Sequence, residues 1–462
     1  MSVQPSPGRA VRRDRARLTT LALVTTVGAV VSSLGAPLVP SIAAQYDVSV
    51  TSAQWALTAT LLAGAVATPV LGRLGTGRRR RPTVLAGIAV VLVGTLLAAL
   101  PLGYGPLVVG RALQGVGLAL VPLALAVARD AYQGADQVRV LALLSVTTVA
   151  GAGLGYPVTS LVAAYTGLHG AYVFGAALVA LTLLRALRHV PADLDVPGQA
   201  VDLVGATLLS TGTLSLLLTV SQGRVWGWTS PATTSLAVLG VVAVAAWVRW
   251  TLRQDHPLVD LRLAARPGVV GPHLVALVLG VGMYGLLSLA VVVVRADGSA
   301  GYGLDLGVAA AGLVLLPYSL ASVAGSRAAR FVDRRYGDRL LLPLGCSSFA
   351  ASLALLAWHH EHLWQLLVAM AVGGLGSGFS FSSLAGLIVP HVPPHETGSA
   401  MAFNQLLRYL GFATGSAVSV VLVEVYGGDA SGLVRALLTL AAMCLLAAVA
   451  ACARDPRSGT PA

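Results

Sequence analysis

The chain consists of long apolar runs that are separated by short polar linkers. A helix needs about 20 consecutive apolar residues to cross a hydrocarbon core of ~30 Å, and fourteen runs have this character. They lie at 19–43, 53–72, 83–103, 106–128, 138–163, 169–188, 202–221, 232–252, 268–294, 307–326, 340–358, 364–390, 397–424 and 434–453. We therefore expect an all-α polytopic membrane protein with fourteen transmembrane helices and no soluble domain.

Composition narrows the class of protein further. Hydrophobic residues make up 56% of the chain and charged residues 10%, whereas a soluble domain contains roughly 25% charged residues. The three cysteines, Cys346, Cys444 and Cys452, all lie in apolar runs and show no disulfide framework or metal-binding spacing. We expect no cofactor and no metal site. Because no intramembrane cluster of catalytic side chains appears either, we do not expect an enzyme.

The placement of the basic residues predicts the topology. All thirty are arginine, and they gather beside the apolar runs. If the N-terminus is cytoplasmic, 25 of them fall in cytoplasmic segments and only Arg224, Arg295 and Arg435 in external ones. This asymmetry predicts a multi-pass protein of the cytoplasmic membrane with both termini inside. The net charge of +12 therefore indicates contact with anionic lipid and excludes nucleic acid as a partner.

A weak internal repeat indicates how the runs are organised. The basic loop 73–81 follows the second run, and a similar basic loop, 327–339, follows the tenth. Such repeats underlie transporters whose two halves rock around a midplane site. We expect a basic cytoplasmic tail at 1–18, an N-terminal six-helix bundle at 19–190, an inserted helix pair at 200–253, a C-terminal six-helix bundle at 267–453 and a cytoplasmic tail at 454–462.

Two arginines lie inside apolar runs. Arg111 is about six residues into the fourth run, roughly 9 Å deep, and Arg408 is about eleven residues into the thirteenth, roughly 16 Å deep, at 1.5 Å per residue. Burying a charged arginine in the membrane costs free energy, so such a residue usually lies on a transport pathway or has a specific partner. The alternative for Arg111 is that its aliphatic carbons extend along the helix and place the guanidinium at the outer membrane interface. Gln114 shares a helix face with Arg111, and Asn404 precedes Arg408 by four residues, which predicts a shared face.

No carboxylate in neighbouring runs is positioned by sequence to neutralise these arginines. Two interpretations remain. In the first, the cargo carries negative charge that a guanidinium can grip through two hydrogen bonds. In the second, backbone carbonyls satisfy both arginines and the cargo is neutral or cationic.

Several motifs together carry a resemblance to a known family. They are 110–117 in the fourth run, 151–157 in the fifth, Pro197, Gly198 and Asp202 before the seventh, 333–337 after the tenth, and Asn404, Arg408, Gly411 and Gly415 in the thirteenth. From about residue 19 to 450 the chain resembles the fourteen-span drug:proton antiporter family of the major facilitator superfamily.

The resemblance implies proton-driven export of a small amphipathic molecule, a drug or secondary metabolite, by alternating access in a monomer. The implied partners are this small molecule, the lipid bilayer and protons. Substrate binding or coupling is implied for Arg111, Gln114, Tyr156, Asn404 and Arg408. Gating is implied for Arg78, Arg79, Asp130, Asp333, Arg334, Gly151, Gly155 and Pro157, with Asp130 pairing with the arginines of loop 73–81 as a latch.

The chain also departs from the family pattern. Thr159 and Ser160 stand where a glycine pair is expected, and loop 73–81 is shortened, with Thr76 near the position of an expected aspartate. The resemblance therefore predicts transport without identifying a proton carrier. Glu424 is the one carboxylate in or at the end of an expected cavity-lining run, and His273 can titrate near neutral pH. Both are candidate proton sites, although a lone histidine that follows a proline, as His273 follows Pro272, is more often a helix-end hydrogen-bonding residue.

This architecture predicts a central cavity lined by the first, second, fourth, fifth, ninth, tenth, twelfth and thirteenth runs. Its expected aromatic residues are Tyr156, Tyr318, Phe379, Phe381 and Tyr409, which suit a bulky, partly apolar ligand. Two other functions compete with export. One is an importer or uncoupled facilitator of the same fold, and the other is a membrane sensor or scaffold that transports nothing.

Overall fold

The computed structural model describes residues 7–75, 77–191, 202–254, 257–266, 268–297, 301–337, 340–392 and 397–452, and these are helical with short connections. The elements up to the middle of the chain are α1 (Pro7–Ser33), η1 (Ala36–Leu38), α2 (Val39–Tyr46), α3 (Val50–Ala53), α4 (Trp55–Leu74), η2 (Gly77–Arg79), α5 (Arg80–Ala99), α6 (Tyr104–Ala131), α7 (Gly134–His189), α8 (Leu203–Trp226) and α9 (Pro231–Thr251). The elements that follow are α10 (Leu261–Ala264), α11 (Val270–Arg295), α12 (Val308–Leu313), α13 (Leu316–Tyr336), α14 (Leu341–Trp358), α15 (Leu363–Ile388), η5 (Val389–His391), α16 (Thr397–Val425) and α17 (Ala430–Cys452).

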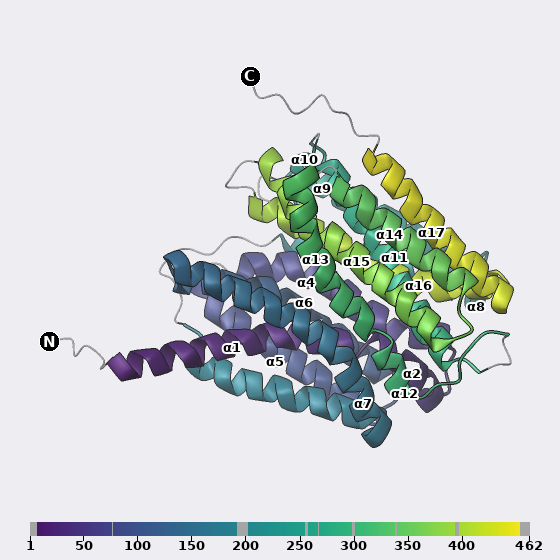
Figure 1. The fold of residues 1–462 in the computed structure, drawn as a ribbon, viewed down its shortest axis with the longest axis horizontal. Coiled ribbons are helices and arrows are strands. Elements are labelled where there is room, and N and C mark those ends of the chain that lie inside the picture. Colours follow the sequence, from purple (N-terminus) through teal and green to yellow (C-terminus); the bar gives the residue numbers. More distant parts are fainter. Residues whose placement is uncertain are drawn as a thin grey trace.

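Twelve segments of the described chain are long and apolar enough to cross a membrane. The 56-residue helix α7 supplies one of these segments but contains two crossings, because Gly167 (φ 74°, ψ −179°) interrupts it. Figure 1 shows the chain doubling back within α7. The 27-residue α1, which packs against α6 and α7, is long enough for a further crossing. Counted this way, the helices agree with the predicted fourteen spans, and the predicted fold class is confirmed.

Proline and glycine explain where the helices differ from the predicted runs. The run expected at 19–43 ends as a helix at Ser33, because Pro37 lies in the short η1 and Gly35 before it has non-helical torsion angles. The tenth run forms two helices, α12 and α13, with Pro317 in the first turn of the second. Helix α13 continues beyond the predicted end at 326 to Tyr336, since arginine and alanine are good helix formers.

The long helices form two bundles. Helices α1, α4, α5, α6 and α7 pack together in the first, and α11, α13, α14, α15, α16 and α17 in the second. In Figure 1 the purple-to-teal bundle and the green-to-yellow bundle converge at the end that carries α2 and α12 and diverge toward the chain termini. At the converging end α12 of the second bundle packs against α7 and η1 of the first. We call this end the closed end.

The inserted pair, α8 and α9, lies across one seam between the bundles. The two helices pack on each other, and α8 contacts both α4 and α16. Asp202 holds the pair together, because its Oδ1 accepts hydrogen bonds from the backbone N–H of Gly205 (2.8 Å) and from Nε1 of Trp250 (2.9 Å). The domain boundaries given above remain predictions.

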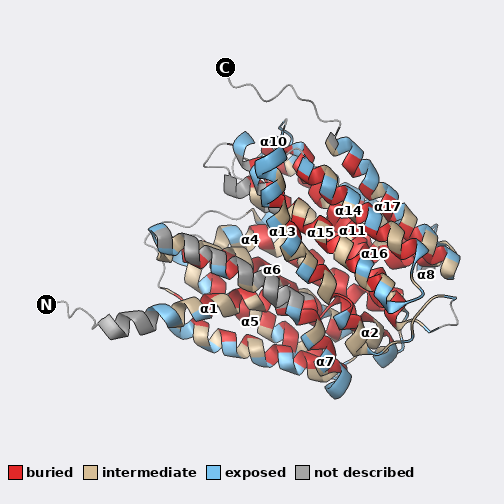
Figure 2. Ribbon diagram, in the orientation of Figure 1, coloured by how far each residue is buried: buried red, intermediate tan, exposed pale blue. Residues whose placement is uncertain are grey.

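Burial follows the helix contacts. Buried residues concentrate where helices face each other, and exposed ones lie on the outside (Figure 2). Val241 and Val242 of α9 are 60% and 58% exposed, as expected for side chains that face lipid. Glycines allow the closest approaches: a Cβ at Gly115 of α6 would collide with the carbonyl oxygen of Thr60 in α4. Packing through small residues is typical of membrane helices.

Candidate functional site

A cavity of about 400 Å³ lies between the two bundles. Its lining is Gly28, Leu61, Leu118, Val121, Pro122, Leu125, Tyr156, Met283, Tyr284, Tyr318, Ser319, Ser322, Ser377, Phe381, Gln405, Arg408, Tyr409 and Phe412. These residues come from α1, α4, α6 and α7 of the first bundle and from α11, α13, α15 and α16 of the second. They are the eight spans that the sequence predicts, so the expected lining is confirmed.

Aromatic rings dominate the wall of the cavity. Four of the five predicted aromatics line it, but Phe379 does not. Phe379 and Phe381 are two residues apart on α15, so about 200° of helix rotation places them on opposite faces. Sequence reasoning missed Tyr284 and Phe412, whose ring centroids lie 4.6 Å apart. Phe412 follows Arg408 by four residues, and this spacing was the available signal.

Arg408 brings a positive charge to the cavity wall. Its Nη2 donates to Oε1 of Gln405 (2.6 Å), and Nε2 of Gln405 donates to the hydroxyl of Tyr409 (2.9 Å). The guanidinium carbon lies 5.1 Å from the ring centre of Phe381 and 5.9 Å from that of Tyr409, within the range of a cation–π interaction. The buried Nε of Arg408 has no hydrogen-bond partner among the described residues.

Asn404 does not share the environment of Arg408, contrary to the expected common face. Its Nδ2 lies 3.4 Å from the carbonyl oxygen of Pro272 and 3.2 Å from Nδ1 of His273 in α11. The partner of Arg408 is instead Gln405, three residues away, whose longer side chain reaches the guanidinium. His273 is 2% exposed and packs edge-on against Phe403. This placement agrees with the helix-end alternative for His273 and puts both Asn404 and His273 outside the cavity lining.

Arg111 is held by backbone groups and by Gln114 and lies outside the cavity lining, although its buried Nη2 has no partner among the described residues. It is fully buried; its Nε donates to the carbonyl of Ala56 (3.0 Å), and its Nη1 donates to the carbonyl of Val31 (3.2 Å) and to Oε1 of Gln114. The hydroxyl of Thr60 donates back to the carbonyl of Arg111 (2.9 Å). Arg111 therefore joins α6 to α1 and α4. Neither Arg111 nor Gln114 lines the cavity. The complete burial of Arg111 contradicts the alternative in which its guanidinium extends to the membrane interface.

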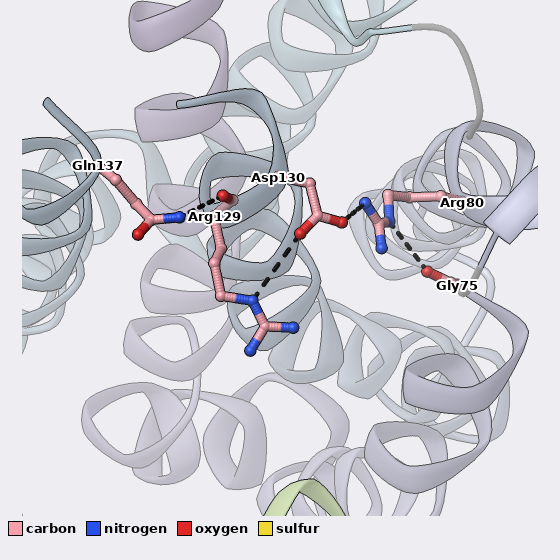
Figure 3. A network of polar contacts seen from close by, with 5 residues as sticks. All are labelled: Gly75, Arg80, Arg129, Asp130 and Gln137. Carbon is pink, nitrogen blue, oxygen red and sulfur yellow. Dashed lines mark hydrogen bonds and ion pairs between the residues drawn. The ribbon is translucent and has the colours of Figure 1, made fainter. Parts of the chain in front are cut away.

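Asp130 forms an ion pair with Arg80, as Figure 3 shows. Arg129 Nε lies 3.9 Å from the other carboxylate oxygen, and Nε of Arg80 donates to the carbonyl of Gly75 (3.2 Å). Gln137 at the start of α7 donates to the carbonyl of Arg129. The predicted partners of Asp130 were the arginines of loop 73–81, and the ion pair forms with one of them, Arg80. All of these residues belong to the first bundle, so the pair does not bridge the two halves.

The other predicted gating residues lie on separate helices. Asp333 and Arg334 are exposed in the last turn of α13. Gly151, Gly155 and Pro157 lie in the first part of α7. Thr159, close to them, donates to the carbonyl of Gly155 (2.8 Å) and to that of Ser33 in α1 (3.1 Å). The second of these hydrogen bonds joins α7 to the end of α1, two residues after Pro157.

A set of polar side chains joins the two bundles between the cavity and the closed end. We call Thr51, Gln54, Thr58, Ser288, Ser416 and Glu424 the closed-end cluster. Gln54 Nε2 donates to Ser288 Oγ (2.7 Å) and Ser416 Oγ (3.0 Å), and Thr58 Oγ1 lies 3.0 Å from Ser416 Oγ. Thr51 donates to Glu424, so this candidate proton site lies in the cluster and not in the cavity.

Sequence reasoning missed the closed-end cluster. Thr51, Gln54 and Thr58 recur at three and four residues, which is the spacing of one helix face. A polar helix face within an apolar segment was the signal that could have found the first half of the cluster. A second contact closes the same end: a Cβ at Gly312 of α12 would lie 2.6 Å from the carbonyl oxygen of Tyr156 in α7.

Two pseudo-equivalent helical bundles around a central cavity define a membrane transporter fold. The sequence profile of the Major Facilitator Superfamily matches residues 21–334 and 274–462. The chain therefore belongs to the Major Facilitator Superfamily and is a membrane transporter, not an enzyme.

Named relatives and a solved structure agree with this family. The chain is 29% identical over 390 residues to the puromycin resistance protein pur8 of Streptomyces alboniger, covering 82% of this chain and 76% of that one. It is 27% identical over 405 residues to the cephamycin export protein CmcT of Amycolatopsis lactamdurans, covering 85% and 81%. A crystal structure of an auto-inhibited POT family peptide transporter is similar in fold, with a TM-score of 0.67, 15% identity and 96% and 99% coverage.

Proposed function

We propose that the protein exports a small amphipathic organic molecule, a drug or secondary metabolite, across the cytoplasmic membrane by alternating access. The observation that carries the proposal is the central cavity between two bundles that converge at the closed end. The closed-end cluster and the contact between Gly312 and Tyr156 separate the cavity from that end. Cargo then reaches the cavity from the end that carries the chain termini.

The direction of transport follows from the predicted topology. With both termini cytoplasmic, as the arginine asymmetry predicts, the conformation described here accepts cargo from the cytoplasm. Breaking the closed-end cluster would then release it outside. The names of the two relatives, a resistance protein and an export protein, support the same direction.

Proton drive is part of the proposal, and Glu424 is its candidate carrier. Glu424 is half-buried at the outer end of α16 and accepts a hydrogen bond from Thr51 across the boundary between the bundles. Protonation of a carboxylate from the outer side weakens it as a hydrogen-bond acceptor. A proton arriving there would therefore favour opening of the closed end, and its release to the cytoplasm would favour closure.

The test is directional transport together with drug susceptibility. Cells that express the protein should tolerate one or more compounds of a drug panel better than cells without it, and inside-out vesicles should accumulate those compounds. Ser322→Trp should abolish both effects by filling the cavity, whereas Val241→Trp on the lipid face should preserve them. Accumulation only in right-side-out vesicles would identify an importer, and accumulation that persists after an uncoupler would identify a facilitator.

A further inference from the structure

The cavity holds a positive charge without an acidic counterpart. Arg408 is the one charged residue among the described residues that line it, and that lining contains no aspartate or glutamate. Removing a guanidinium from water costs several kcal/mol unless a counter-charge or a full set of hydrogen bonds compensates. The observed compensation consists of the hydrogen bond to Gln405, a polar interaction with the hydroxyl of Tyr409, and the faces of the Phe381 and Tyr409 rings. Cation–π interactions contribute about 0.5–2 kcal/mol each. These interactions therefore offset only part of the free-energy cost of removing the guanidinium from water.

Arg408 also retains donors for a ligand. An arginine has five N–H donors in a planar fork, and the contacts described for Arg408 are those to Gln405 and Tyr409. Its Nε is buried and has no partner in the part of the chain that the structure describes, so the donors that a ligand can reach are those of the terminal Nη atoms. Arg111 also keeps one buried nitrogen, Nη2, without a partner among the described residues. It differs from Arg408 in two ways: it lies outside the cavity lining, and its guanidinium donates to two backbone carbonyls and to Gln114.

The rest of the wall describes the body of the ligand. A volume of about 400 Å³ lies in the range of sites for drug-sized molecules. The rings of Tyr284 and Phe412 pair on one side, and the hydroxyls of Ser322 and Ser377 lie 3.3 Å apart on another. Such a wall suits a flat apolar body with one or two polar substituents.

On the basis of the proposed transport function, we infer that the cargo is an amphipathic organic anion, an aromatic or polycyclic molecule with a carboxylate or phenolate that Arg408 binds. Two N–H groups of one guanidinium can donate to both oxygens of a carboxylate. Gln405 holds the guanidinium at the cavity wall, so this interaction requires no large movement of the side chain.

The experiment measures binding apart from transport. The purified full-length protein in lipid nanodiscs is titrated with a panel of aromatic carboxylates, each paired with its neutral primary amide, and thermal stabilisation reports affinity. In the wild-type protein the carboxylates should bind about tenfold more tightly than their amides, the effect of a charge-assisted hydrogen bond of ~1.4 kcal/mol. Arg408→Gln should remove this preference while the amides bind as before, and Arg408→Lys should keep part of it.

Three results would overturn the inference. One is equal or tighter binding of amides by the wild-type protein, another is an equal loss of both compound classes in Arg408→Gln, and the third is no stabilisation by any pair. Val241→Gln, on the lipid face, is the control for a general effect of substitution. Transport of a bound carboxylate is then measured in vesicles. A carboxylate that binds through Arg408 but is never transported would contradict the proposed export and leave the assignment of the binding site intact.

Discussion

An ion pair between Arg80 and Asp130 stabilises the first bundle at the end away from the closed end. Arg80 connects the carbonyl of Gly75, where α4 ends, with the last turn of α6. The side chains are 15% and 28% exposed, so the pair contributes at most about 1 kcal/mol to stability. Its effect is therefore expected on the positions of the helix ends more than on folding.

We predict that Asp130→Asn lowers the transport rate about fivefold, the factor that corresponds to ~1 kcal/mol, with normal amounts of protein in the membrane. In the proposed transport cycle the α4–α5 turn moves when the end opposite the closed end closes, and the ion pair between Arg80 and Asp130 orients this turn. Arg80→Gln should show the same defect. Arg79→Gln is the control and should show a smaller one. Initial transport rates in vesicles, normalised to protein content, measure the effect; an unchanged rate in Asp130→Asn would refute the latch.

The arginines inside the membrane show where prediction from sequence ends. Their burial could be predicted, because each lies well within an apolar run. Their different surroundings could not, since Arg111 donates to the carbonyls of Ala56 and Val31, which are 55 and 80 residues away in the chain. The sequence also could not show whether Gln405 or Asn404 is the partner of Arg408, because the two residues precede it by three and four positions, about one helical turn.

At the scale of helices, the closed end depends on contacts between elements of opposite bundles. The apolar periodicity predicted the helices, and the architecture implied by the family resemblance predicted the eight that line the cavity. It could not predict the closed-end cluster, because Gln54 is 234 residues from Ser288 and 362 from Ser416. Such pairs depend on how the two halves dock, which the local sequence does not encode.

The approach of α12 to α7 provides a test of the closed end. Gly312→Leu would force a side chain against Tyr156 and Ser160, and overpacking of this kind costs about 1–3 kcal/mol. The closed conformation should become less populated. A cysteine introduced by Ser160→Cys, at a position that is fully buried here, should then react about tenfold faster with a membrane-impermeant thiol reagent applied from outside.

Gly307→Leu is the matched control, because a Cβ at Gly307 has no neighbour within 4 Å. It lies immediately before the same helix α12 and should leave the labelling rate unchanged. Equal labelling in both leucine variants would show that Gly312 does not hold the closed end.

At the scale of the whole molecule, the orientation in the membrane remains a prediction from the arginine asymmetry. Helices α8 and α9 reverse at Gly227, which has a φ of 86°. The loop around Trp228 should therefore lie on the outer side if the termini are cytoplasmic.

A reporter that is active only in the cytoplasm distinguishes the two orientations. Fused after Arg454 it should be active, and fused after Trp228 it should be silent. A fusion after Arg253, beyond α9, is the control for the inserted pair. The predicted topology places this position in the cytoplasm, so the reporter should be active there. Activity at Trp228 would contradict the predicted place of α8 and α9 in the topology.

The position of α8 also makes the two flanks of the transporter unequal toward the bilayer. Because α8 contacts both α4 and α16, it screens the seam between these helices from lipid. The opposite seam joins α7 to α12 and α13, and no further helix is inserted there within the described residues. If the termini are cytoplasmic, we therefore expect an apolar molecule dissolved in the cytoplasmic leaflet to enter the protein from the side of α7 and α13, not from the side that α8 screens.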